Sequence, residues 1–76
     1  MGMMEFNVMD QTGHSKHLWD VDQPHEVDAA REMFNSLKKK GYKAFHVKKD
    51  GEEGKQMDAF DPLSGKFIMV PPIVGG

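Results

Sequence analysis

The sequence predicts an α+β fold in which one helix packs across one face of a mixed sheet of about five strands. One segment, residues 24–40, has the apolar spacing of an amphipathic helix. Two strand-like runs precede it and three follow it. A chain of 76 residues has room for one helix on one sheet and none for a deep internal cavity. We therefore expect a single domain over residues 1–70 and a flexible tail over residues 71–76.

The first two strands are predicted to form a hairpin. Residues 4–10 alternate between apolar and polar side chains, which is typical of a half-buried strand. Residues 11–16 are polar and contain Gly13, so they are expected to form the loop. Residues 17–21 then return as a second, shorter strand.

The helix is the element with the clearest boundaries. Pro24 suits a first helical position, and Gly41 suits a left-handed cap after the last turn. Lysines at 38–40 complement the negative end of the helix dipole. One apolar stripe is formed by Val27, Ala30, Phe34 and Leu37. The start signal, the apolar stripe and the end signal all predict a helix over residues 24–40.

Three strands are expected after the helix. Residues 42–49 and 55–60 form a second hairpin around a turn at 50–54, and a loop at 61–66 leads to the last strand, 67–70. This last strand is apolar on both faces, which predicts a central position in the sheet. Placed parallel to the first strand, it completes the β-grasp arrangement and sends the tail off one end of the sheet.

The tail, residues 71–76, combines two kinds of backbone. Pro71 and Pro72 fix φ and lack backbone donors, so they end the strand and continue as a stiff spacer. Gly75 and Gly76 have no side chains to obstruct close approach of another molecule. Fully extended, six residues reach at most ~20 Å. Because the sequence contains no cysteine, the chain cannot carry a thioester on its own side chains. The groups that can be activated for acyl transfer are therefore its carboxylates, of which the α-carboxylate of Gly76 is the best exposed.

Residues 60–76, with the sequence FDPLSGKFIMVPPIVGG, resemble the end of the ubiquitin-like sulfur carriers. The match is closest to the small subunit of molybdopterin synthase, which typically ends in two prolines, two variable residues and two glycines. Ubiquitin is similar in length, element order and double-glycine end, but it lacks the prolines. The sequence departs from the family at residues 64–66, where an acidic turn is usual, and its first hairpin does not match the sulfur carriers.

The resemblance implies a carrier or modifier protein that is a substrate of enzymes and not itself an enzyme. An ATP-dependent activating enzyme would adenylate the carboxylate of Gly76. A sulfur donor would then convert it to a thiocarboxylate for a partner such as a molybdopterin synthase-like large subunit, or a conjugating enzyme would transfer it to an amine. No cofactor is expected on the chain itself. The residues expected to contact these partners are Phe67, Met69, Pro71, Pro72, Ile73 and Val74, with Gly75 beside the reactive Gly76.

An alternative is a small binding module that acts through the exposed face of its sheet, with no chemistry in the tail. Several large apolar residues of the predicted strands cannot all face one helix, so some are expected on a docking surface. They are Phe45, Val47, Phe60, Phe67 and Met69.

Composition argues against other classes of function. A net charge of −2 does not favour a nucleic-acid or membrane partner, and the lysine-rich residues 38–49 are expected to be a solvated surface. His14 and His17 are close in sequence, but a zinc site needs three or four convergent ligands, so exposed hairpin histidines are expected instead. The acidic residues at 20–28 could act as a catalytic acid and base only beside a cleft and a nucleophile. The sequence indicates neither, so a solvated helix end is expected. The N-terminus has no signal-peptide pattern, so a cytoplasmic protein is expected.

Overall fold

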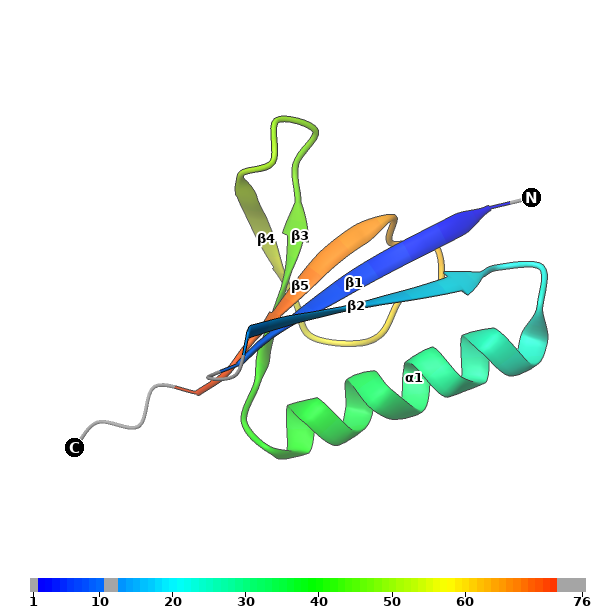
Figure 1. The fold of residues 1–76 in the computed structure, drawn as a ribbon, viewed down its shortest axis with the longest axis horizontal. Helices are drawn as coiled ribbons and strands as arrows, with labels where there is room; N and C mark the ends of the chain where they lie inside the picture. The colour runs from blue at the N-terminus through cyan, green and yellow to red at the C-terminus, as the bar shows by residue number, and fades with distance from the viewer. Residues whose placement is uncertain (1, 11–12, 73–76) are drawn as a thin grey trace.

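The computed structural model describes residues 2–10 and 13–72. One helix lies across one face of a five-stranded mixed sheet, as Figure 1 shows, so the predicted α+β class is confirmed. The elements follow in the predicted order of two strands, one helix and three strands. Their bounds are β1 Met3–Asp10, β2 Gly13–Asp20, α1 Pro24–Lys39, β3 Lys43–Val47, β4 Glu53–Met57 and β5 Lys66–Val70.

The last strand is central, as predicted. The strand order is β2-β1-β5-β3-β4. Strand β5 pairs parallel with β1, with Phe6 opposite Phe67, and antiparallel with β3, with Phe45 opposite Ile68. A central strand has a paired strand along each edge, so its side chains have neighbours to pack against on both faces of the sheet. This agrees with the apolar sequence of β5.

The first hairpin is longer than predicted. Pairing runs without interruption from Met3 opposite Asp20 to Asp10 opposite Gly13, so β2 spans Gly13–Asp20 and not residues 17–21. The residues assigned to a loop are polar because β2 is an edge strand with most of its side chains in solvent. A strand in that position does not need apolar alternation to form.

The second hairpin is shorter and displaced. Strand β3 ends at Val47, and β4 begins at Glu53, two residues before the predicted start. A shift of register between Phe45 and Val47 interrupts their pairing. The predicted strand 55–60 ends at Met57, and Phe60 lies in the following loop, where its ring is 5.4 Å from that of Trp19.

The helix ends one residue before the predicted position. Gly41 has φ of 96°, and its N–H donates to the carbonyl of Lys38 at 3.0 Å. The N–H of Tyr42 donates to the carbonyl of Leu37, also at 3.0 Å. These two bonds form a Schellman motif, which satisfies the last carbonyl groups of α1 and turns the chain into β3.

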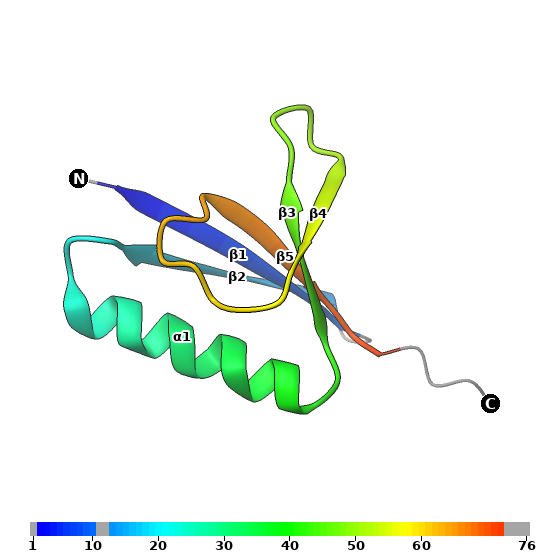
Figure 2. The same ribbon diagram turned by 180° about the vertical axis from the view of Figure 1, so that it is seen from behind.

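The core lies between the sheet and α1 and is rich in aromatic rings. Phe67 lies at its centre, stacked on Phe6 at 5.0 Å and edge-on to Phe34 at 5.7 Å between ring centroids. The loop between β4 and β5 covers one side of this core (Figure 2), and its Pro62 carbonyl accepts a hydrogen bond from Trp19 Nε1 at 3.2 Å. The buried residues are Phe6, Val8, Trp19, Ala30, Phe34, Ala44, Met57, Phe67 and Met69.

Candidate functional site

Strand β5 delivers the chain to the candidate site. Its neighbours β1 and β3 hold it through backbone pairing along both sides, with Val70 opposite Lys43. Pro71, half-buried, and Pro72, exposed, follow directly. Because proline has no N–H to donate, pairing ends where the tail begins. The tail therefore starts from one of the most firmly held strands of the fold.

Phe67 and Met69 do not belong to a docking surface. Both are 0% exposed and lie in the core between the sheet and α1. The expectation that they contact a partner is wrong, because strand alternation directs them toward the helix. The side chains of β5 that face away from α1 are Lys66, Ile68 and Val70, and Ile68 is half-buried in this position.

The first exposed residue of the tail lies against the end of the helix. A Cβ placed on Gly41 would be 3.4 Å from both Cβ and Cγ of Pro72. The proline ring therefore lies over the Schellman turn, at contact distance from the Cβ position of Gly41. This contact helps to hold Pro72 in place at the end of the described chain.

Four of the predicted site residues lie outside the described residues: Ile73, Val74, Gly75 and Gly76. Their assigned roles stay predictions from the sequence.

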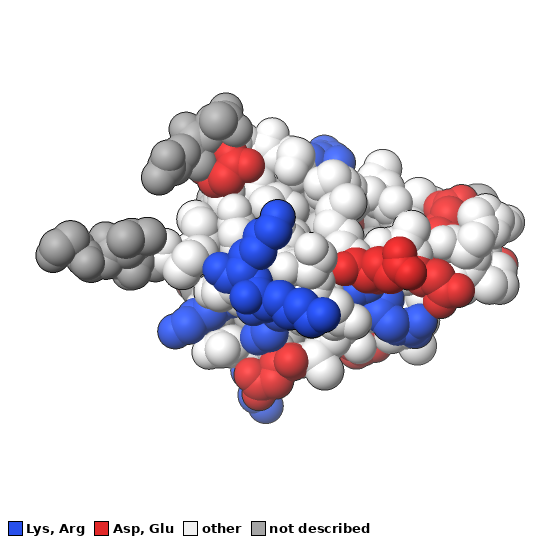
Figure 3. All heavy atoms as spheres, turned by 90° about the horizontal axis from the view of Figure 1, so that it is seen from below, with Lys and Arg blue, Asp and Glu red and all other residues white. Residues whose placement is uncertain are grey.

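Lysines surround the base of the tail. Lys38 and Lys39 occupy the last turn of α1, Lys40 follows it, and Lys43 is paired with Val70. Figure 3 shows lysine side chains gathered on the surface near the end of α1. This surface is positive, although the chain as a whole has a net charge of −2.

The face of the sheet opposite α1 carries a polar cluster that the sequence did not predict. Glu5 Oε2 accepts a hydrogen bond from Asn7 Nδ2 at 2.9 Å and lies 3.4 Å from Lys66 Nζ. The hydrogen bond from Asn7, with the positive charges of Lys66 and Lys16, lowers the pKa of Glu5 below its ordinary value, although desolvation opposes the shift. The signal in the sequence was the alternation of residues 4–10, which places Glu5 and Asn7 on one face.

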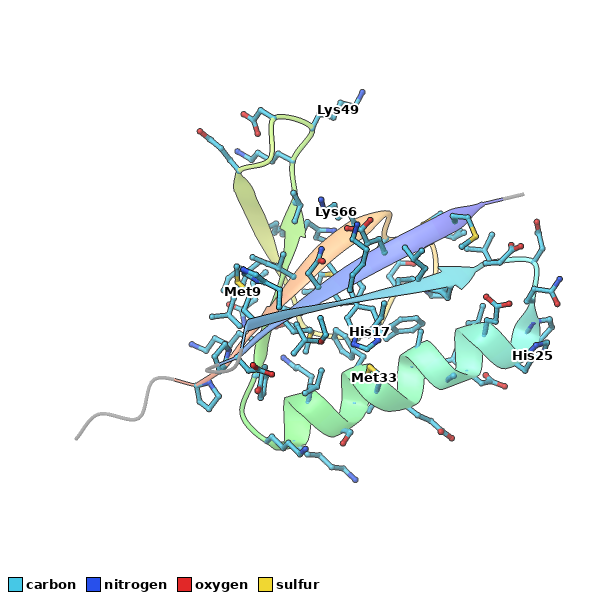
Figure 4. All side chains as sticks on the ribbon, viewed as in Figure 1. Met9, His17, His25, Met33, Lys49 and Lys66 are labelled. Atoms are coloured by element: carbon cyan, nitrogen blue, oxygen red, sulfur yellow. The ribbon has the colours of Figure 1, made fainter. Side chains whose placement is uncertain are left out.

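A groove of about 450 Å³ crosses this outer face. Figure 4 labels Met9 and Lys66, which lie along it. The lining is mostly apolar with a few polar groups, and it is formed by Asn7, Met9, His14, Val47, Gly51, Lys66 and Ile68. Of the five apolar residues expected on a docking surface, Val47 lines this groove.

The two hairpin histidines face opposite sides of the sheet. His14 is paired with Met9 on the outer face, whereas His17 is paired with Phe6 and stacks on its ring at 4.9 Å. His17 is therefore half-buried and not exposed as predicted. Within residues 2–10 and 13–72, no three His, Cys, Asp or Glu side chains are placed to hold a metal ion.

Helix α1, the only helix in the described part of the chain, is too short and too polar to cross a membrane. Comparison of the chain with protein-family models, with curated proteins and with solved structures gave no match. Function is therefore inferred from the residues of this chain.

Proposed function

We propose that this chain is a ubiquitin-like β-grasp protein that works as a sulfur carrier or protein modifier through its C-terminal glycine. The observation that supports this most is the exit of the sequence PPIVGG from a central strand that runs parallel to β1. A strand held on both sides gives the tail a fixed origin. The two prolines extend it, and the two glycines make a narrow end that can enter another protein's nucleotide site.

The first proposed step is adenylation by a partner enzyme. An oxygen of the Gly76 carboxylate attacks the α-phosphate of ATP, the bond to the β,γ-diphosphate breaks, and pyrophosphate leaves. The product is an acyl-adenylate at Gly76. This chain contributes the nucleophilic carboxylate and its position, and the partner binds ATP.

The second step has two possible acceptors. A persulfide of a donor can attack the acyl carbon, so that AMP leaves and an acyl disulfide forms. A second thiol of the donor then attacks the donor's own sulfur, which forms a disulfide in the donor and releases the thiocarboxylate of Gly76. Alternatively, a partner cysteine takes the acyl group as a thioester, and a lysine amine then displaces the thiol to form an amide. The chain contains no cysteine, so either thiol comes from a partner.

The domain has two roles in this proposal. Its core holds β5 in place, and its outer face and the lysines near Pro72 recognise the activating enzyme. The groove beside Lys66 and Ile68 gives that face both apolar surface and charge.

The groove also supports a second candidate function. A module that binds another protein through the outer face would need only the groove, and the tail would have no chemistry. Removing Gly75 and Gly76 separates the two, because a binding module keeps its partner and a carrier loses its activity.

The mass of the chain recovered from its native host tests the proposal. Sulfur carriage predicts a fraction whose mass increases by the replacement of one oxygen with sulfur. Conjugation predicts partner lysines that carry the remnant of residues 67–76 after trypsin, because Lys66 is the last basic residue of the sequence. A chain lacking Gly75 and Gly76 is the control and should show neither. If the intact chain shows neither product, while partner capture survives the deletion, the binding module is the better account.

A further inference from the structure

The sheet has one long and regular edge strand. Strand β2 pairs only with β1 among the described strands, and its eight residues keep one register throughout. Its other side faces no described strand, but it is already bonded at Asp20. The N–H of Asp20 donates to Glu26 Oε1 at 3.1 Å, and its C=O accepts from the N–H of Gln23 at 3.0 Å, so backbone pairing with another strand is centred on Leu18 and involves Asp20 through its side chain. Such an edge is a template for another strand, which natural proteins usually block or use.

The opposite edge is built differently. Strand β4 has five residues, and its pairing with β3 is broken by the register shift between Phe45 and Val47. Short length and a bulge are two of the devices that prevent strand addition. Strand β2 has neither.

Apolar side chains are exposed along the β2 edge. Leu18 is 56% exposed on β2, Met3 is 55% exposed on β1, and Met33 is 38% exposed on α1. Leu18 and Met33 line a hollow of about 170 Å³ between β2 and α1. His17 and Met33, labelled in Figure 4, lie between these two elements. This much apolar surface beside an open edge indicates a partner.

The charges on β2 indicate what that partner is. Trp19 is buried against the core, so strand alternation places Leu18 and Asp20 on the outer face. Lys16 shares that face, two residues before Leu18. The outer face of β2 therefore runs from basic through apolar to acidic within five residues, and such a pattern is complementary to itself when reversed.

We propose that β2 of a second copy of this chain pairs antiparallel with β2 about a two-fold axis at Leu18. Leu18 then lies opposite Leu18 of the second copy, and Lys16 lies opposite Asp20 on each side of it. Cross-strand apolar and opposite-charge pairs stabilise a sheet, and like charges destabilise it. A parallel arrangement in register would place Lys16 against Lys16 and Asp20 against Asp20.

This register is favoured over its neighbours. Sliding the second strand by two residues in either direction places Leu18 against a charged side chain, Lys16 in one case and Asp20 in the other. The proposed pairing joins two five-stranded sheets into one continuous sheet. It also places the two α1 helices on the same face, so that the hollows beside Met33 adjoin. This pairing is independent of the proposed function.

Sedimentation velocity of the full chain over a range of concentrations tests this pairing. We expect a reversible dimer. Lys16→Glu creates two like-charge contacts per dimer, so we expect it to weaken dimerisation by roughly ten-fold or more. Asp20→Lys should have the same effect. Mixing the two variants should restore the dimer as a heterodimer. In that heterodimer the introduced glutamate of one chain faces the introduced lysine of the other, and the unchanged Asp20 faces the unchanged Lys16.

Lys55→Glu, the same change of charge on strand β4, is the matched control and should leave dimerisation unchanged. The fluorescence of the buried Trp19 checks that each variant is folded. The Asp20 carboxylate accepts a hydrogen bond from the N–H of Asp22 at 2.9 Å, so Asp20→Lys can disturb the turn. If that variant unfolds, Leu18→Glu replaces it and should abolish the dimer in a folded chain. A wild-type chain that stays monomeric at the highest attainable concentration contradicts the proposal. So does a dimer that a folded Lys16→Glu variant retains.

Discussion

Phe67 and Ile68 are neighbours on β5, yet they belong to two different surfaces. Phe67 is fully buried among the aromatic rings beneath α1, whereas Ile68 is half-buried on the opposite face beside the Glu5–Lys66 ion pair. The core face holds β5 in the sheet. The outer face offers a groove with apolar and charged groups. A change on one face should therefore affect stability, and a change on the other should affect recognition.

The largest effect is expected on the core face. Phe67→Ala removes the ring at the centre of the aromatic cluster, and we expect it to lower the free energy of unfolding by about 3–5 kcal/mol. Urea unfolding followed by the fluorescence of Trp19 measures this change. Equal losses for Phe67→Ala and Ile68→Ala would contradict the division into two faces.

On the outer face, Ile68→Ala should lower the free energy of unfolding by roughly 1–2 kcal/mol, because less apolar area is buried there. If this face meets the activating enzyme, the same variant should slow adenylation several-fold at limiting concentrations of the chain. Leu63→Ala is the matched control, since Leu63 is 71% exposed and lies outside the strands. An Ile68→Ala chain that is activated as fast as the wild type would remove this face from the recognition surface.

Gly41 links the helix to the base of the tail. With φ of 96°, Gly41→Ala should lower the free energy of unfolding by roughly 1–2 kcal/mol from backbone strain alone. Gly51→Ala is a matched control, because Gly51 has φ of 87° and open space around its Cβ position. Any additional loss at Gly41 measures crowding against Pro72. In the Pro72→Gly background, which removes both the Cβ and the Cγ that lie near this position, that additional loss should disappear.

The smallest effect is expected from the pH dependence of Glu5. Its pKa is lowered in the folded chain, so its ionised form stabilises the fold at neutral pH, and this contribution is lost as the pH falls through the range of carboxylate titration. Glu5→Gln should therefore make stability less dependent on pH between about 3 and 6. Glu32→Gln, on the exposed surface of α1, is the control. An unchanged pH profile for Glu5→Gln would show that the Asn7 and Lys66 contacts do not favour the ionised form.

The features that sequence predicted correctly are those that depend on strong local patterns. The helix follows from Pro24, a single apolar stripe and Gly41, and the central place of β5 follows from its continuous apolar run. The bounds of β2 and β4 were missed because an edge strand can be polar and a bulge leaves no simple pattern. Phe67 and Met69 were assigned to the wrong surface because a strand that is apolar on both faces does not reveal which side meets the helix. The Glu5–Lys66 pair joins residues far apart in the chain, and only the parallel register of β1 and β5 brings them together.

The central claim is that the carboxylate of Gly76 is adenylated, a step that sulfur carriage and conjugation share. Isotope exchange between pyrophosphate and ATP, measured in fractions of the native host with added chain, tests this step most directly. The account predicts exchange that requires the full chain and disappears when Gly75 and Gly76 are removed from an otherwise folded domain. Exchange that is equally fast with the shortened chain, or that never depends on the chain in any fraction, would contradict it.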